Sequence, residues 1–580
     1  MTTDAATVPG EVPVEAAGEV SAEVRDEPAQ ASASHLGQSE WPQGQVDREI
    51  RPAPARYRNV LGKYKIDRLA RCASCGRCVE VCRHGVHVKP RGYAFTLRPQ
   101  DHLCIGPECA ETPESCVAQC PQKALTMRRN PAADCMGDPR WSSDLILSTW
   151  HQAATGHAAP PHLEYRHGAS GGGFDRLRFK FQATKSKAPA RAVGSAGAAS
   201  VAAAPVTAGP VTAASVTAAP VAPGSAVAVD IDTGLDLNQR GDGRPQVHLD
   251  IPMYGGGMSF GSVSIHTILA KARAAAAWNS FTCTGEGGYH DRLRPYDDHV
   301  ITQVATGLFG VREETIQRVR IVEFKYAQGA KPGLGGHLLG DKNTPPVARM
   351  REAVAGNALF SPFPFHSVYS VEDHKKHLDW IKEVNPDCLV SVKVSTPTDV
   401  DMVAVGSYYA GAHIIHLDGS YGGTGAAPDI AKKNIAMPIE YAIPKVHKFL
   451  VAEGIRDQIT LIASGGLRTA YDALKAIALG ADGVVIGTAE LVALGCVRCA
   501  CCESGRGCPR GIATTDPEIM MQMSLEWATQ RLINLNNAWR EEMLVVLGHL
   551  GMASIRELRG RSDVLCYLAD EPAMAGEVSP

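Results

Sequence analysis

The chain has 580 residues, 44% of them apolar, so it is long enough for two or more domains with sizeable cores. Its net charge of −3 excludes the strongly basic surface expected of a protein that binds nucleic acid or anionic membranes. The N-terminus lacks the basic and then apolar order of a signal peptide, and no apolar run is long enough to span a bilayer. We therefore expect a cytoplasmic protein with neither nucleic acid nor membrane as a partner.

Two segments contain too few large apolar residues to form a core. Residues 1–50 are rich in Ala, Glu, Val, Pro and Ser, which predicts a disordered tail. Residues 185–227 consist almost wholly of Ala, Val, Pro, Ser, Thr and Gly, which predicts a linker at a domain boundary. Between them we expect a cysteine-rich domain over residues 51–135 and a connecting segment, residues 136–184, that packs against the domain after the linker.

The cysteine-rich segment has the spacing of a bacterial ferredoxin. Its first four cysteines follow the pattern C-x2-C-x2-C-x3-C, in which three hold one 4Fe-4S cluster and the fourth reaches a second cluster. Zinc ligation or disulfides are the alternatives. Crossing the fourth ligands predicts two clusters, held by Cys72, Cys75, Cys78 and Cys120 and by Cys82, Cys104, Cys109 and Cys116.

After the linker, β-like and α-like patterns alternate over residues 228–515. Apolar runs such as residues 389–394 are separated by helical periods such as residues 371–384, and glycine-rich turns follow the strands. This order predicts an α/β fold, a (β/α)8 TIM barrel behind the ferredoxin-like domain. A doubly wound Rossmann sheet is the alternative, disfavoured because no GxGxxG opens the first unit. The helical periodicity within residues 516–580 predicts a helical cap, followed by a tail.

Two glycine turns and a cysteine cluster lie near the end of this region. Gly465-Gly466 and Gly487-Thr488 each follow a predicted strand, as in the phosphate site after the last two strands of a barrel. Tight turns without a ligand are the alternative. The cysteines that follow predict an iron–sulfur cluster rather than buried free thiols; they are Cys496, Cys499, Cys501, Cys502 and Cys508.

Several motifs in the barrel region resemble the FMN-binding synthase domain of glutamate synthase. They are residues 257–262 (GMSFGS), residues 284–288 (TGEGG), residues 328–333 (QGAKPG), residues 422–426 (GGTGA) and residues 487–489 (GTA). The resemblance covers about residues 230–565. With the ferredoxin-like segment ahead of it, the chain is most similar to the short, archaeal-type members of that family.

The resemblance implies an FMN-containing barrel with a cluster beside it. The family's cluster is 3Fe-4S with the spacing C-x5-C-x4-C, whereas Cys496, Cys502 and Cys508 are spaced C-x5-C-x5-C. A 3Fe-4S and a 4Fe-4S cluster therefore both stay open, with Cys499 and Cys501 as alternative ligands. The residues implied at FMN are Met258, Ser259, Phe260, Gly261, Gln328, Lys393, Gly422, Gly423, Thr424, Gly425, Gly465, Gly466, Gly487 and Thr488.

The implied substrate residues are Glu286, Lys331 and Arg349, of which Glu286 and Lys331 are the expected catalytic groups. His337 stands where the family has a glutamine at a substrate contact. A buried structural salt bridge is the alternative role for the three charged residues.

The resemblance implies reductive amination of 2-oxoglutarate to glutamate, with electrons passing through the N-terminal clusters and the barrel cluster to FMN. The sequence shows no amidotransferase domain like that of large glutamate synthases, so we expect ammonia or an amine from solution or from a separate glutamine amidotransferase subunit. We expect an electron-donor protein as a second partner. The alternatives are a synthase of an N-substituted glutamate such as N-methylglutamate, a non-catalytic electron-transfer subunit, and an FMN-free phosphate-binding barrel.

Overall fold

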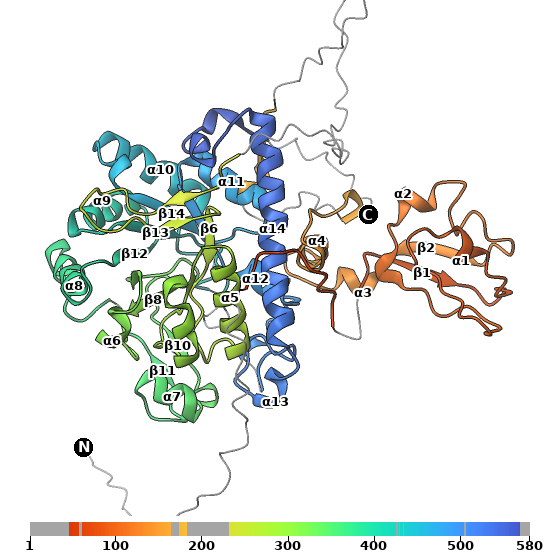
Figure 1. The fold of residues 1–580 in the computed structure, drawn as a ribbon, viewed down its shortest axis with the longest axis horizontal. Coiled ribbons are helices and arrows are strands. Elements are labelled where there is room, and N and C mark those ends of the chain that lie inside the picture. The colour runs from red at the N-terminus through yellow and green to blue at the C-terminus, as the bar shows by residue number, and fades with distance from the viewer. Residues whose placement is uncertain are drawn as a thin grey trace, which may run out of the picture. The chain divides into compact units, whose positions relative to one another are not determined.

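A closed barrel of eight parallel strands, surrounded by helices, dominates the computed structural model (Figure 1). The predicted TIM barrel is confirmed, and the Rossmann alternative is wrong because the strands form a closed ring. The barrel strands are β6 (Met253–Gly255), β7 (Thr282–Cys283), β8 (Val300–Ala305), β9 (Ile321–Lys325), β12 (Leu389–Ser395), β13 (Ile414–Asp418), β14 (Thr460–Ser464) and β15 (Gly483–Ile486).

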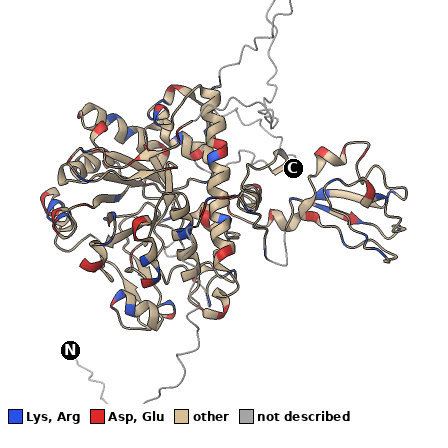
Figure 2. Cartoon of the chain, viewed as in Figure 1, with Lys and Arg blue, Asp and Glu red and all other residues tan. Residues whose placement is uncertain are grey.

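The structure describes residues 46–56, 61–163, 173–181, 231–362, 364–424, 427, 430–432, 434–503 and 506–568. The predicted linker over residues 185–227 and most of the predicted N-terminal tail lie outside these ranges. Among the described helices, none is both long and apolar enough to cross a membrane. Figure 2 shows acidic and basic residues interspersed along the barrel helices, as the small net charge leads one to expect.

The strand register brings the strand ends to one level. Ser395 pairs with Asp418 across β12 and β13, and Asp418 pairs with Ser464 across β13 and β14. Because all eight strands are parallel, the loops that follow them meet at this end of the barrel, where TIM-barrel enzymes place their active sites. At the other end, the hairpin of β4 (Leu235–Asp236) and β5 (His248–Leu249) contributes Leu235 and Leu249 to the apolar filling of the barrel interior.

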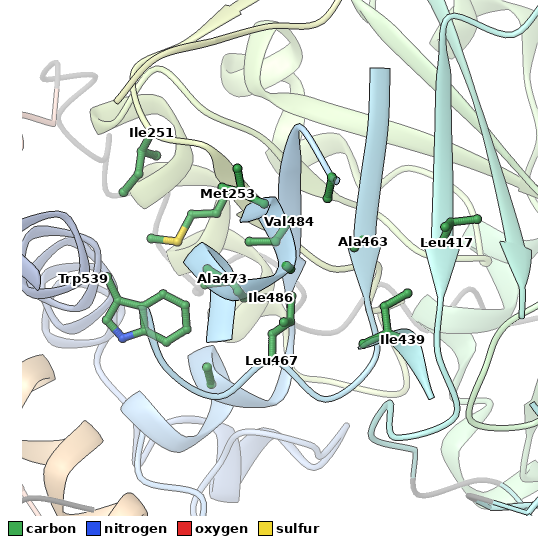
Figure 3. Packing of buried hydrophobic residues seen from close by; sticks show 14 of the residues in the cluster. Ile251, Met253, Leu417, Ile439, Ala463, Leu467, Ala473, Val484, Ile486 and Trp539 are labelled. Atoms are coloured by element: carbon green, nitrogen blue, oxygen red, sulfur yellow. The ribbon is translucent and has the colours of Figure 1, made fainter. Parts of the chain in front are cut away.

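Alternation along the strands divides the apolar residues into two layers. In β13, Ile414 belongs to the cluster inside the barrel, whereas Ile415 and Leu417 belong to the larger cluster between strands and helices. Figure 3 shows part of this larger cluster, including Ala463 and Leu467. The helices that contact the barrel strands are α5 (Ile265–Ala277), α8 (Val371–Val384), α9 (Val400–Ala410), α10 (Ile439–Ala452) and α11 (Ala470–Leu479). The shorter α6 (Glu313–Ile316), α7 (Pro345–Arg351) and α12 (Thr488–Ala493) lie in the segments that follow β8, β9 and β15.

A single helix of 26 residues, α14 (Leu525–Leu550), runs along one side of the barrel beside α5 and α12 (Figure 1). It follows the short α13 (Pro517–Met520). The hydroxyl of Ser524 caps its start by accepting from the Trp527 N–H, and Gly551 ends it in a left-handed conformation. Its Trp539 is fully buried in the cluster shared with the strands.

Segments from before the linker pack on α14. Residues 46–56 are extended along it, and the buried Arg531 donates to the Ala53 carbonyl (2.7 Å) and the Trp150 carbonyl (3.2 Å). Residues 46–50, which the composition assigned to the tail, are part of this arm: the Asn537 side chain donates to the carbonyl of Arg48. The arm is held by backbone carbonyls, which composition does not reveal.

The connecting segment also lies against the barrel. After α3 (Pro131–Asp134), the helix α4 (Ser143–Thr155) contacts α12 and α14, and the Trp150 indole N–H donates to the Val492 carbonyl (2.8 Å). Further on, β3 (Leu177–Phe179) pairs antiparallel with β16 (Leu565–Tyr567). The chain on both sides of the predicted linker thus forms one packed body at these contacts.

The cysteine-rich module has a small core of its own. An antiparallel pair, β1 (Tyr64–Arg68) and β2 (Leu125–Arg129), flanks the short helices α1 (Arg77–Val81) and α2 (Pro107–Ala110). Ile66, Val86 and Leu125 form its buried centre together with Cys116. So few apolar residues stabilise a fold only weakly, which is usual for a module that depends on metal ligation.

One buried carboxyl on α14 should make stability depend on pH. Burial raises the pKa of Glu542 to about 8, although the Gln152 amide donates to it at 2.8 Å. The folded protein therefore holds a proton that the unfolded chain has released, so stability falls as pH rises from the ordinary carboxyl pKa to about 8. Glu542→Gln should be more stable than the parent by about 2 kcal/mol at about pH 8 and nearly equal at about pH 5. Thermal unfolding at the two pH values measures this.

The matched control is Glu541→Gln, whose side chain is about half exposed. It should reduce the pH dependence only slightly, because the charge of Glu541 contributes less than burial does to the raised pKa of Glu542. Equal stabilisation by both variants would show that net charge, rather than the buried Glu542, sets the effect.

Candidate active site

Two buried ion pairs lie at the ends of the barrel strands. Lys325, the last residue of β9, is 3.2 Å from Glu286, and Lys393 near the end of β12 is 3.3 Å from Asp418. Each of the four side chains is less than 15% exposed. Buried charges are costly unless they are paired or bind a charged ligand, so this concentration of charge at the strand ends is the candidate functional centre.

Asp418 connects the two halves of this centre. Its carboxylate accepts from the Gly329 N–H (3.1 Å) and from the Ser464 hydroxyl (2.6 Å), besides pairing with Lys393. Burial opposes ionisation, but Lys393 and His416 hold the pKa of Asp418 below its ordinary value. An ionised Asp418 therefore fixes the loop of residues 328–333 to the position of Lys393.

A row of hydrogen-bonded polar side chains inside the barrel leads to Asp418. The Gln303 amide donates to Glu323 (2.7 Å), Glu323 lies 2.8 Å from His416 Nδ1, and His416 Nε2 lies 2.7 Å from Ser464 Oγ. His416 and Lys393 overcome burial and lower the pKa of Glu323 to about 2. The sequence analysis did not identify this row. Its only signal is a charged or polar residue at the third position of β9 and of β13, directly after two apolar residues.

Glu286 and Lys331, the predicted catalytic groups, lie in one electrostatic neighbourhood. Burial and the charge of Lys325 lower the pKa of Lys331 to about 8, while Glu286 opposes the shift. A side chain at Gly336 would overlap the Glu286 carboxylate and displace it from its present position. The predicted substrate contact His337 begins β10 (His337–Leu338), paired with β11 (Leu359–Phe360), and its ring stacks on Phe360 (4.6 Å between centroids).

Two arginines of α7 differ in their burial. Arg349 is exposed on α7, whereas Arg351 is 4% exposed, donates to the Ser259 hydroxyl (3.0 Å) and the Phe260 carbonyl (3.2 Å), and is near Glu286. Residues two apart on a helix point to nearly opposite sides. The role of Arg349 stays a prediction, and the burial of Arg351 near Glu286 makes Arg351 a second candidate for the substrate contact.

Loops after β13, β14 and β15 form a glycine-lined cradle. Gly465 and Gly466 have φ near +100°, a region that only glycine adopts easily, and a side chain on Gly465 would overlap Gly419. A Cβ on Gly423 would lie 2.5 Å from the Thr488 hydroxyl, and one on Gly487 would lie 3.4 Å from the Met258 side chain. The predicted cofactor residues Met258, Gly423, Gly465, Gly466, Gly487 and Thr488 thus line one region, which fits a phosphate-bearing ligand. Gly425 lies outside the described residues.

The cysteines gather in three groups. The thiols of Cys72, Cys75, Cys78 and Cys120 line one pocket of the N-terminal module. Burial raises the pKa of Cys104, Cys109 and Cys116, and the proximity of Cys82 raises each further. These two N-terminal groups correspond to the two crossed ligand sets expected from the spacing, and their ligation of iron–sulfur clusters stays a prediction.

In the barrel, burial and the thiols of Cys496 and Cys508 raise the pKa of Cys502 to about 11, whereas Cys499 and Cys501 are exposed. Within the described ranges, no three His, Cys, Asp or Glu side chains converge closely enough for a single metal ion. A cluster of several irons holds its thiolates farther apart, so the three groups fit cluster ligation by their donor chemistry.

Comparison with known proteins identifies the family. Residues 225–553 match the family model described as the conserved region in glutamate synthase. The chain belongs to the glutamate synthase family. The archaeal-type glutamate synthase (NADPH) of Thermotoga maritima is 35% identical over 503 residues, covering 85% of this chain and 92% of that protein. The archaeal glutamate synthase (NADPH) of Methanocaldococcus jannaschii is 43% identical over 322 residues, covering 55% and 63% of the two chains.

The family membership confirms the resemblance found in the barrel motifs and identifies the chain as a glutamate synthase-type oxidoreductase. The glutamate synthase (NADPH) large chain of Azospirillum brasilense is 38% identical over 319 residues, but these cover only 21% of that protein. In this glutamate synthase family member, the charged residues described above lie at the same barrel end as the glycine cradle.

Proposed function

We propose that the chain is an FMN- and iron–sulfur-dependent enzyme that converts 2-oxoglutarate and ammonia to glutamate. The observation that carries this proposal is the group of cations Lys325, Lys331 and Arg351 around Glu286, at the same strand ends as Lys393 and the glycine cradle. Such a concentration of positive charge suits a dicarboxylate. Ammonia would come from solution or from a separate amidotransferase subunit, and electrons would come from a donor protein.

The residues present fit FMN. The loops containing Gly465, Gly466, Gly487 and Thr488 would hold its phosphate through backbone N–H groups, and Lys393 would lie near the ring system, where a cation stabilises negative charge. Gln328, Gly422, Thr424 and the Met258–Gly261 loop would complete its surroundings. When bound, FMN supplies hydride to the substrate carbon, using electrons that the iron–sulfur clusters deliver.

The protein's own residues bind the substrate and move protons. Lys331 and Arg351 would hold the two carboxylates, so that the carbonyl carbon faces the amine and the cofactor side. Glu286 Oε2 would carry two protons, one after the other, from the amine nitrogen to the carbonyl oxygen: the first as the C–N bond forms, and the second as the C–O bond breaks and the oxygen leaves as water. Each glutamate formed then consumes two electrons and two protons in total.

The deciding experiment is anaerobic. The purified protein is reduced, 2-oxoglutarate and ammonia are added separately and together, and the flavin absorbance is followed. Reoxidation only with both substrates, with glutamate as the product, is the expected result. Flavin that stays reduced with every amine would identify the chain as an electron-transfer subunit. Faster reoxidation with methylamine than with ammonia would favour an N-substituted glutamate, for which the specific observation is His337 at a substrate position.

The lowered pKa of Lys331 predicts how substrate affinity changes with pH. The ammonium form binds the dicarboxylate and is present below about pH 8, so the KM for 2-oxoglutarate should rise about tenfold per pH unit above that value. Lys331→Arg keeps its charge at these pH values and should give a flat profile. Initial rates between about pH 7 and about pH 9.5 measure both profiles. An unchanged slope in Lys331→Arg would assign the titration to another group.

A further inference from the structure

Residues 137–141, which we call the bridging segment, contact two loops of the barrel. On one side, the Gly137 N–H donates to the Val497 carbonyl (3.1 Å), and the Asp138 carboxylate pairs with Arg498 through its Nε (2.9 Å) and Nη2 (2.8 Å). Val497 and Arg498 directly follow Cys496. The bridging segment therefore fixes the loop that carries the barrel cysteines, although it belongs to the chain before the linker.

On its other side, the bridging segment reaches the glycine cradle through Arg140. This side chain is 5% exposed, its Nη2 is 3.4 Å from the Gly466 carbonyl, and its guanidinium lies 3.7 Å from the centre of the Tyr421 ring. A Cβ on Gly466 would lie 2.7 Å from Arg140 Nη2. Arg140 thus borders the loop after β14, and Tyr421, on which it stacks, precedes Gly423 and its contact with Thr488.

The Arg140 side chain is buried, and hydrogen bonds fix its backbone on both sides. Its backbone N–H donates to Asp138 (2.8 Å), and Arg468 donates to its carbonyl (3.2 Å). Burial and the charge of Arg468 lower the pKa of Arg140, while the carboxylates of Glu440 and Asp472 oppose the shift. Arg468 itself pairs with Asp175 and Asp472. A phosphate dianion beside Arg140 would add to the effect of the Glu440 and Asp472 carboxylates, because guanidinium groups donate two parallel hydrogen bonds to phosphate oxygens.

We propose that Arg140, which lies outside the barrel sequence, contributes a positive charge to the phosphate end of the flavin site. This inference rests on the proposed function, since it requires FMN at the glycine cradle. It adds a residue from the connecting segment to a site otherwise built from barrel loops. Retention of the cofactor would then depend on the docking of the segment that leads from the iron–sulfur module.

The test compares two flavins that differ only in the phosphate. The full chain is freed of flavin under anaerobic conditions, and the quenching of flavin fluorescence gives the Kd for FMN and for riboflavin. Arg140→Gln should weaken FMN about tenfold to a hundredfold and change riboflavin less than about twofold, because only FMN loses a charged partner. Arg140→Lys keeps the charge but not the two parallel donors of the guanidinium, so its Kd for FMN should lie between those of the parent and of Arg140→Gln.

Arg178→Gln is the matched control, because it removes the same charge from an exposed position on β3 of the same connecting segment. It should leave both constants unchanged. Equal weakening of FMN and riboflavin by Arg140→Gln would show a merely structural role, and unchanged FMN binding would place the phosphate elsewhere; either result overturns the inference. Failure of the parent protein to bind either flavin would instead overturn the proposed function.

Discussion

Replacement of Cys508 by alanine should abolish reduction of the flavin by an external donor. Cys508 is buried and lies with Cys496 and Cys502 at the barrel, where these thiols would hold the cluster next to the flavin in the electron path. Loss of a ligand removes or converts the cluster, and we expect donor-dependent flavin reduction to slow by at least about a hundredfold. Mutation of a residue that is only hydrogen-bonded to a metal ligand can already lower activity by about that factor. Rapid-mixing absorbance under anaerobic conditions measures the rate, and iron and sulfide analysis measures the cluster.

The neighbouring exposed thiols supply the control. Cys501→Ala and Cys499→Ala should retain the iron content and the reduction rate of the parent, because both side chains are exposed. FMN should stay bound in all three variants. A full complement of iron in Cys508→Ala, together with a loss in Cys499→Ala, would assign Cys499 in place of Cys508 and contradict the ligand set proposed here.

Arg351→Met should lower kcat/KM for 2-oxoglutarate by about a hundredfold or more, because a buried charge that pairs with a substrate carboxylate contributes several kcal/mol. Methionine fills a similar volume without the charge. Steady-state kinetics with excess ammonia measures the effect, and the loss should lie mainly in KM. The flavin content of the variant should equal that of the parent, which separates a substrate role from the structural contacts of Arg351 with Ser259 and Phe260.

Arg349→Met is the control for this experiment, since it removes the same charge from the exposed face of the same helix. Its kcat/KM should remain within about twofold of the parent. A large loss in Arg349→Met with little change in Arg351→Met would restore the assignment made from the sequence motifs alone.

The barrel was predictable because its signals are local. Alternating periods define strands and helices, and a turn such as Gly465-Gly466 needs positive φ at a strand end, which glycine alone adopts easily. The spacing of the N-terminal cysteines likewise depends only on the covalent chain. Each of these features can be recognised without knowing which strand pairs with which.

The residues that the sequence analysis missed depend on register and docking. Glu323 and His416 meet only because β9 and β13 flank β12 in the closed barrel, and nothing in either strand alone predicts the partner. The choice between Arg349 and Arg351 depends on the rotation of a seven-residue helix. Arg140 reaches Gly466 across 326 positions of the sequence, a separation that no local pattern spans.

The contact between the arm of residues 46–56 and α14 affects how the chain is made. Ala53 and its partner Arg531 are 478 residues apart, so at ordinary synthesis rates the arm waits about half a minute to a minute and a half for its docking helix. During that interval the cysteine-rich module has already left the ribosome, with all eight of its expected ligands. Metal insertion into the nascent module can therefore precede completion of the barrel. The arm can dock only after α14 has been synthesised.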